Sequence, residues 1–173
     1  MDMATTMRSR RSVRGFVDTP MSRETIEQIL DLARLAPSGS NYQPWKMVYV
    51  CTGEVKLALS RELLQLHYAG GGDHSEEYHY YPQVWREPYL GRRRELGWGL
   101  YSLLSIGRQD KDKMMRQLAR NYEFFGAPVV LFFSIDRDME YGGWLETGMF
   151  IYGVIPAASS RTRKRLTTRT TGR

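Results

Sequence analysis

The stretch from Arg10 to Trp45, RRSVRGFVDTPMSRETIEQILDLARLAPSGSNYQPW, contains two polar motifs with an apolar-periodic segment between them. The motifs are Arg10–Phe16 and Ala36–Trp45. Between them, apolar residues recur at intervals of three and four, which predicts one amphipathic helix that starts after an N-cap at Ser22. The residues on its apolar face are Ile26, Ile29, Leu30 and Ala33. Such a helix holds the two motifs in a defined relation to each other.

The first motif is a cluster of cations. Arg10, Arg11 and Arg14 place three guanidinium groups within five residues, together with the hydroxyl of Ser12. A guanidinium presents a rigid fork of donors that matches the oxygens of a phosphate. Short basic stretches are also common as solvated surface, so this motif alone leaves both interpretations open.

The second motif has the composition of a polar loop. Pro37, Gly39 and Pro44 interrupt regular structure. Its donors and acceptors are supplied by Ser38, Ser40, Asn41 and Gln43. Polar groups on a loop that a rigid scaffold holds are typical of a binding site.

Together the two motifs resemble the FMN-dependent nitroreductase family, in which both lie at similar distances from the N-terminus. The resemblance implies that Arg10, Arg11 and Ser12 bind the phosphate and ribityl chain of FMN. It also implies that Arg14 approaches the pyrimidine edge of the flavin ring. A cation there has a physical purpose, because reduced flavin carries negative charge at N1 and O2. The alternative role of Arg14 is a surface salt bridge.

The resemblance assigns the second motif to a dimer. In the family this loop reaches across the subunit interface, which implies that Pro37, Ser38, Gly39 and Asn41 contact the flavin of the partner subunit, with Gln43 supporting the loop. The implied architecture is an α+β nitroreductase-like fold, in which a central mixed β-sheet is flanked by helices and two chains form an intertwined homodimer.

Composition predicts one folded domain followed by a basic tail. The chain has 173 residues, of which 42% are hydrophobic, enough for a core. The net charge of +6 arises in residues 156–173, which hold six basic and no acidic residues. We therefore expect a nitroreductase-like domain over 1–155 and a disordered tail over 156–173 that binds polyanions only nonspecifically. Nothing upstream of the tail indicates a specific nucleic-acid module.

Other classes of function find little support. The longest apolar run, Pro128–Ile135, is too short to cross a bilayer, and the N-terminus lacks the hydrophobic stretch of a signal peptide, so we expect a cytoplasmic protein without membrane association. The three histidines, His67, His74 and His79, have spacings that match no usual metal site. We therefore predict no metal.

The rest of the chain alternates helices and strands. We expect strands at Lys46–Val50 and Val129–Ile135, and helices at Glu54–Gln65, Arg93–Leu104, Lys111–Phe125 and Trp144–Ile155. The second strand is apolar on both faces, which favours the centre of a sheet. The last helix is apolar nearly all round and corresponds by resemblance to the central dimer helix. An aromatic segment, His74–Tyr89, runs on into Pro88–Arg94, and the whole stretch resembles the subgroup of the family that reduces nitroaromatic compounds; the alternative is that these rings form core and dimer interface.

The implied function is that of an oxidoreductase. NADPH or NADH reduces FMN and leaves, and the reduced flavin passes electrons to a nitroaromatic compound or a quinone in a ping-pong sequence. Because the cofactor carries this chemistry, no side chain is assigned as catalytic.

The resemblance ends near Tyr152. The further core strand, the loop facing flavin N5 and the additional phosphate-binding arginine of the family are not recognisable beyond it, and the abrupt change of composition at Gly153–Pro156 resembles a truncation or frameshift. The alternative function is therefore a catalytically defective member that dimerises but binds FMN poorly.

Overall fold

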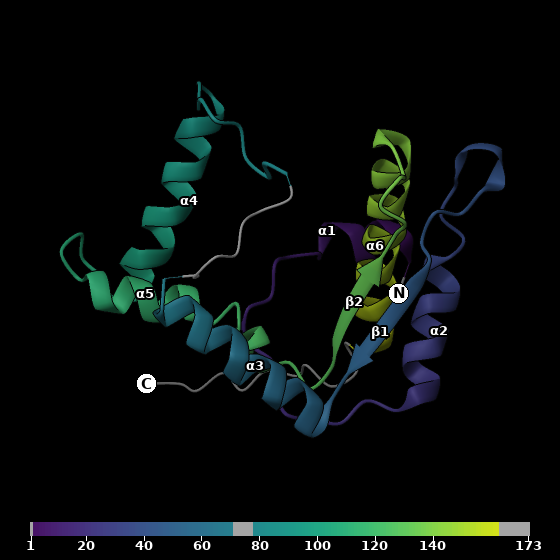
Figure 1. Ribbon diagram of the computed structural model, residues 1–173, viewed down its shortest axis with the longest axis horizontal. Coiled ribbons are helices and arrows are strands. Elements are labelled where there is room, and N and C mark those ends of the chain that lie inside the picture. Colours follow the sequence, from purple (N-terminus) through teal and green to yellow (C-terminus); the bar gives the residue numbers. More distant parts are fainter. Residues whose placement is uncertain (1, 71–77, 163–173) are drawn as a thin grey trace. The chain divides into compact units, whose positions relative to one another are not determined.

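The computed structural model describes residues 2–70 and 78–162 of the chain (Figure 1). The sequence predicts one domain, whereas the chain divides into two compact units. Among the described residues, the first is made by residues 2–56 with 126–162, and the second by residues 57–70 with 78–125. The sequence motifs described above, Arg10–Phe16 and Ala36–Trp45, both belong to the first unit.

The sheet of the first unit consists of two antiparallel strands. Strand β1, Met47–Cys51, pairs with β2, Val130–Ser134, so that Met47 lies opposite Ser134 and Cys51 lies opposite Val130. Both strands lie within one residue of their predicted positions. Within the described residues β2 pairs only with β1. The α+β class is therefore confirmed, while the pairing seen here is antiparallel only and does not place β2 between two neighbours.

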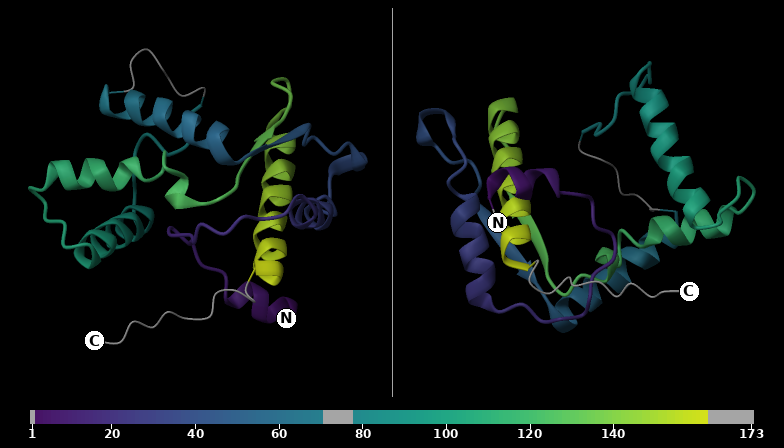
Figure 2. Two further views of the ribbon diagram at one scale, coloured as in Figure 1. Left: turned by 90° about the horizontal axis from the view of Figure 1, so that it is seen from below. Right: turned by 180° about the vertical axis from the view of Figure 1, so that it is seen from behind.

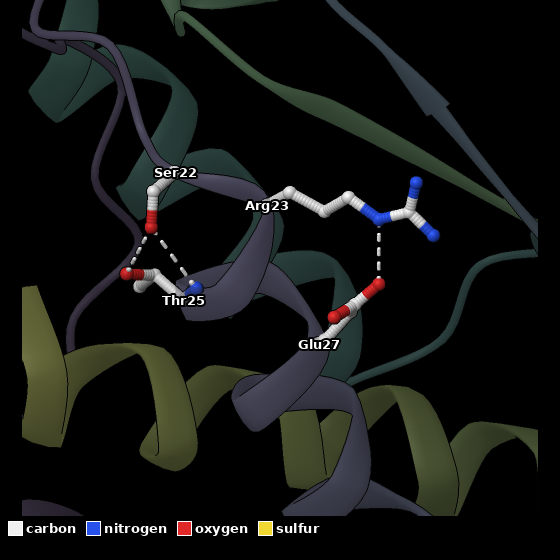
Figure 3. A network of polar contacts seen from close by, with 4 residues as sticks. All are labelled: Ser22, Arg23, Thr25 and Glu27. Atoms are coloured by element: carbon white, nitrogen blue, oxygen red, sulfur yellow. Dashed lines mark hydrogen bonds and ion pairs between the residues drawn. The ribbon is translucent and has the colours of Figure 1, made fainter.

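Helix α2, Arg23–Ala33, begins where its capping residue predicts. The Ser22 Oγ accepts the backbone N–H of Thr25 at 3.3 Å and lies 3.1 Å from the Thr25 hydroxyl, as Figure 3 shows. One turn on, Arg23 Nε donates to Glu27 Oε1 at 2.7 Å, an exposed pair that contributes little stability. The predicted apolar residues face inward: Ile26, Ile29 and Ala33 are buried and Leu30 is half-buried.

Helix α6, Tyr141–Thr162, is the centre of this unit and packs against α2 and α1 (Figure 2). Its Phe150 is buried, stacked on Trp45 at a centroid distance of 5.0 Å and edge-on to Phe133 of β2 at 5.5 Å. Gly153 brings the backbone of α6 close to α2, since a Cβ there would lie 3.1 Å from the Ala33 Cα. Helix α6 thus packs against β2 through Phe150 and against α2 through Gly153.

The sequence predicts a disordered tail from Pro156 onward, but the first residues of that tail are helical. Residues 156–162 continue α6, with Pro156 inside the helix and Ala157 buried. Burial against the unit stabilises these turns although their composition is polar, since tertiary packing outweighs propensity. Residues 163–173 lie outside the described residues.

Helix α1, Met3–Arg8, has no counterpart in the sequence-based expectations. The Asp2 side chain caps it, accepting the Thr5 N–H at 2.9 Å and the Thr5 hydroxyl at 2.7 Å. Thr6 is buried in the unit, and α1 contacts α6. The helix ends at Arg8, and its C-cap Ser9 directly precedes the cationic motif, so the helix anchors the start of that motif to the unit.

The second unit is helical. Most of α3 (Gly53–Tyr68) belongs to it, with α4 (Tyr89–Leu103) and α5 (Lys111–Ala119). Two side chains of α3 reach backbone carbonyls of the same unit: Ser60 Oγ donates to the Tyr122 carbonyl at 2.8 Å, and His67 Nε2 lies 3.2 Å from the Met115 carbonyl.

Helix α5 is shorter than predicted. It ends at Ala119 rather than Phe125, and a short 3-10 turn, η2, covers Phe124–Gly126. Phe124 and Phe125 have φ of 51° and 53°, in the left-handed region, which ends any regular helix.

The aromatic segment forms no helix from Tyr78 to Pro88, and its residues 74–77 lie outside the described part. Here the Arg93 guanidinium covers the Trp85 ring at 4.6 Å from its centroid. In the part of the chain that the structure describes, no helix is long and apolar enough to cross a membrane.

Candidate functional site

The loop after α2 has an unusual backbone. It contains the short 3-10 helix η1, Gly39–Asn41. Ser40, Asn41 and Gln43 have φ of 48°, 57° and 47°, a region that non-glycine residues rarely adopt. Residues held in such conformations persist only when their surroundings hold them there, and they concentrate at functional sites.

Two hydrogen bonds that involve side chains of the loop hold this backbone. The Ser38 Oγ accepts the Gln43 N–H at 3.1 Å, and the Gln43 amide Nε2 donates to Asn41 Oδ1 at 2.7 Å. Gln43 thus contacts two other residues of the loop, while its role toward a flavin stays a prediction. The side chains of Ser38 and Asn41 each accept one of these hydrogen bonds, which orders them although the loop is exposed.

A third contact comes from α6, 107 residues further along the chain. The Gly39 N–H donates to Glu146 Oε1 at 2.7 Å, and a Cβ at position 39 would lie only 3.1 Å from the same oxygen. Tyr42 lies beside this carboxylate: burial and the neighbouring Glu146 raise the pKa of its hydroxyl. Position 39 therefore favours glycine, because its backbone approaches a side-chain oxygen closely.

Glu146 was not among the residues predicted from the sequence. A signal was present, because it is the only charged residue between Tyr141 and Ser160 of an otherwise apolar helix. A charge in such a setting requires a partner. The partner, a backbone amide in a distant loop, is visible only in the folded chain.

The cationic motif forms an exposed segment without regular secondary structure between α1 and α2. Neither Arg10 nor Arg11 forms an ion pair with an acidic side chain in the described part of the chain. The Arg14 Nη1 donates to the Ser12 carbonyl at 3.5 Å, a long local contact. The structure thus leaves Arg10 and Arg11 directed to solvent, where they are available to an anion.

The two motifs lie at opposite ends of α2. The cationic segment precedes Arg23 and the polar loop follows Ala33, so that eleven helical residues, about 16 Å of helix, separate them. Figure 1 shows the loop beyond the C-terminal end of α2. The structure does not bring the two motifs together within one chain.

An open apolar groove of about 700 Å³ runs along α2 and α6. Leu32, Leu35 and Pro37 line one side, and Leu145, Met149 and Tyr152 line the other. Several of these side chains are largely exposed, with Leu35 at 73% and Leu145 at 68%. The polar loop begins at the rim of this groove, because Pro37 belongs to both.

Comparison with known proteins places this geometry in a class. The structure resembles the crystal structure of the FMN and NADPH-dependent nitroreductase NfnB from Sphigopyxis sp. strain HMH, with a TM-score of 0.82 and 35% sequence identity over 91% of this chain and 70% of that one. The fold is therefore the α+β fold of the nitroreductases.

Sequence relatives give the same result at the level of the family. A nitrobenzene nitroreductase of Ectopseudomonas oleovorans is 37% identical over 90% of this chain and 68% of its own length. A 4-nitrobenzoate reductase of Pseudomonas putida is 39% identical over 92% of this chain and 69% of its own length. The family model for the nitroreductase family matches residues 7–161. The chain belongs to the nitroreductase family of oxidoreductases. The match extends nine residues past Tyr152, near which the resemblance of the sequence motifs was expected to end.

Proposed function

We propose that this chain binds FMN and uses NADPH or NADH to reduce nitroaromatic compounds. The observation that carries the proposal is the presence of both polar motifs on a fold that matches an FMN and NADPH-dependent nitroreductase with a TM-score of 0.82. The similarity to nitrobenzene and 4-nitrobenzoate reductases supports a nitroaromatic acceptor. Quinones are a second acceptor class that we include in the proposal.

The residues present fit a flavin phosphate. Arg10 and Arg11 are exposed, pair with no carboxylate among the described residues, and follow a capped helix that holds the segment's start. We infer that these guanidinium groups and the Ser12 hydroxyl bind the phosphate and ribityl chain. Arg14 would place positive charge near the pyrimidine edge, where it stabilises negative charge that develops on reduction.

Flavin, when bound, supplies the redox chemistry, in which a hydride is accepted from the nicotinamide and electrons are then delivered to the acceptor in ping-pong order. The chain's residues contribute binding, orientation and electrostatics. We propose no side chain as nucleophile or general base.

We further propose a homodimer whose interface includes the groove along α6. One side of this helix is buried in its own unit, but Leu145 and Tyr152 remain 68% and 44% exposed. Exposed apolar surface of this extent is typical of an interface. In such a dimer Pro37, Ser38, Gly39 and Asn41 would contact the partner's flavin, which agrees with the separation of the two motifs by α2.

The test is a visible spectrum of the purified protein with added FMN, followed by anaerobic NADPH and then nitrobenzene or 4-nitrobenzoate. We expect bound flavin that bleaches with NADPH and regains its colour with the nitro compound. A folded dimer that takes up no FMN would reject the proposal and support the alternative of a defective family member. Bleaching by NADPH without reoxidation by the nitro compound would support FMN as cofactor and NADPH as electron donor, but would reject a nitroaromatic compound as the acceptor.

A further inference from the structure

We propose that Glu146 is the positioning residue of the Ser38–Gln43 loop, and that it acts through the backbone N–H of Gly39. The role in flavin binding rests on the proposed function, while the anchoring itself can be tested without any cofactor.

The loop needs an external anchor. Three of its residues have positive φ without being glycine, and the hydrogen bonds within it join residues 38–43 only to one another. All of these bonds would be kept if the loop shifted as a body. The Gly39–Glu146 hydrogen bond joins the loop to α6, the helix whose Phe150 lies in the core.

The chemistry of Glu146 suits an anchor. A carboxylate that accepts a backbone N–H makes a charge-assisted hydrogen bond, about twice as strong as a neutral one. Its Oε1 makes this bond at 2.7 Å, while its Oε2 is buried and accepts no hydrogen bond within the described part of the chain. The carboxylate is therefore committed to the loop and is not a surface charge.

The surrounding residues are shaped to accept this arrangement. Gly39 has no side chain to displace Oε1, and a Cβ at Gly143 would lie 2.9 Å from the Met139 Cβ and 3.3 Å from the Tyr42 hydroxyl oxygen. Burial and the neighbouring Glu146 carboxylate raise the pKa of the Tyr42 hydroxyl, and the neutral hydroxyl that faces the carboxylate does not repel it. Two glycines and a tyrosine thus accommodate one carboxylate between the loop and α6.

The same helix has the exposed apolar groove on another side. Leu145 and Tyr152 line the groove, whereas Glu146 contacts the loop. A rigid helix thereby links the position of the loop to the position of the proposed interface. A loop that serves the partner's flavin must be held in this way, because small displacements of binding groups weaken binding sharply.

The experiment compares Glu146→Ala, Glu146→Gln and the control Glu140→Gln, a substitution of an exposed glutamate just before α6. Hydrogen exchange of the Gly39 amide is measured by NMR in the cofactor-free chain. In Glu146→Ala we expect exchange about ten to a hundred times faster, confined to residues 38–43, because a hydrogen bond to a charged group is lost. Glu146→Gln, whose side-chain carbonyl can still accept the bond, should restore most of the protection, and the control should match wild type.

Flavin affinity is the second readout, followed by quenching of FMN fluorescence. We expect Glu146→Ala to weaken binding at least about tenfold and Glu146→Gln to change it only a few-fold. Unchanged Gly39 exchange in Glu146→Ala would overturn the anchor, whatever happens to flavin. Faster exchange with unchanged FMN affinity would overturn the positioning role.

Two further outcomes are distinguishable. If wild type binds no FMN, the proposed function fails, and the exchange data still decide whether Glu146 anchors the loop. If Glu146→Ala does not fold, Glu146→Met decides, because methionine fills similar space without an oxygen that could accept the Gly39 N–H: a several-fold rise in exchange limited to the loop supports the anchor, and wild-type exchange throughout rejects it.

Discussion

Arg10 and Glu146 illustrate how opposite charges are used at the scale of single residues. Arg10 is exposed and pairs with no carboxylate among the described residues, whereas Glu146 accepts a backbone hydrogen bond at 2.7 Å from a loop 107 residues away. An exposed cation can still form an ion pair with a ligand, whereas a half-buried anion requires a hydrogen-bond donor from the protein itself. The first is therefore a candidate for binding and the second for positioning.

Arg10→Ala should weaken FMN binding about ten to a hundredfold, because a charge-assisted hydrogen bond to phosphate is lost. Titration of FMN fluorescence measures the change. The control is Arg34→Ala, whose guanidinium pairs with Asp31 at 2.8 Å on the surface of the same unit and should leave affinity unchanged. Equal affinities in wild type and Arg10→Ala would show that the cationic motif is solvated surface.

Helix α1 shows how an element depends on one cap. The hydrogen bonds from the Thr5 side chain and backbone lower the pKa of Asp2 below its ordinary value. A lowered pKa in the folded state means that the stabilising contribution is present above the ordinary Asp pKa of about 4 and is lost as the pH falls through the folded value. The cap should therefore fail on acidification.

We predict that α1 loses helical NMR shifts below about pH 4 in wild type, with a midpoint below that of an unperturbed Asp. Asp2→Asn should remove this pH dependence, because asparagine caps a helix but does not titrate. A titration of α1 that is the same in both proteins would assign the change to another group.

At α6, the close approach to α2 makes one glycine sensitive to substitution. A Cβ at Gly153 would lie 3.1 Å from the Ala33 Cα, a backbone atom that cannot move alone. Gly153→Ala should therefore destabilise the protein by about 1–3 kcal/mol, the usual effect of overpacking, as measured by urea unfolding.

The matched control is Gly99→Ala in α4, where a Cβ meets no atom within 4 Å. That substitution should be neutral or stabilise by up to about 1 kcal/mol, because alanine favours a helix over glycine. If Gly153→Ala were equally stabilising, the α2–α6 contact would be looser than the structure indicates.

At the scale of the whole molecule, the open groove along α6 bears on the proposed dimer. Leu145→Asp should raise the dimer dissociation constant by about thirtyfold or more, because a symmetric interface buries the uncompensated charge twice. Sedimentation velocity over a range of concentrations checks this. Leu103→Asp in α4, at an 86% exposed position, is the control. Unchanged association in Leu145→Asp would place the interface elsewhere.

Much of the secondary structure could be predicted because its causes are local. The Ser22 cap and the spacing of Ile26, Ile29 and Ala33 specify α2, and the apolar run before Ser134 specifies β2. The end of helix α5 could not be predicted in the same way: the left-handed backbone at Phe124 and Phe125 excludes a regular helix up to Phe125, and these residues have no local preference for that conformation. The extension of α6 past Pro156 was missed because burial of Ala157 outweighs composition.

The family and the two motifs can be predicted from the sequence, because short-range spacing and residue type carry that information. The contact of Glu146 with Gly39, the packing of α1 on α6 and the separation of the motifs by α2 are seen only in the folded chain. These are contacts between residues far apart in the chain, and their geometry is set by the packing of α6 against its neighbours rather than by any local preference.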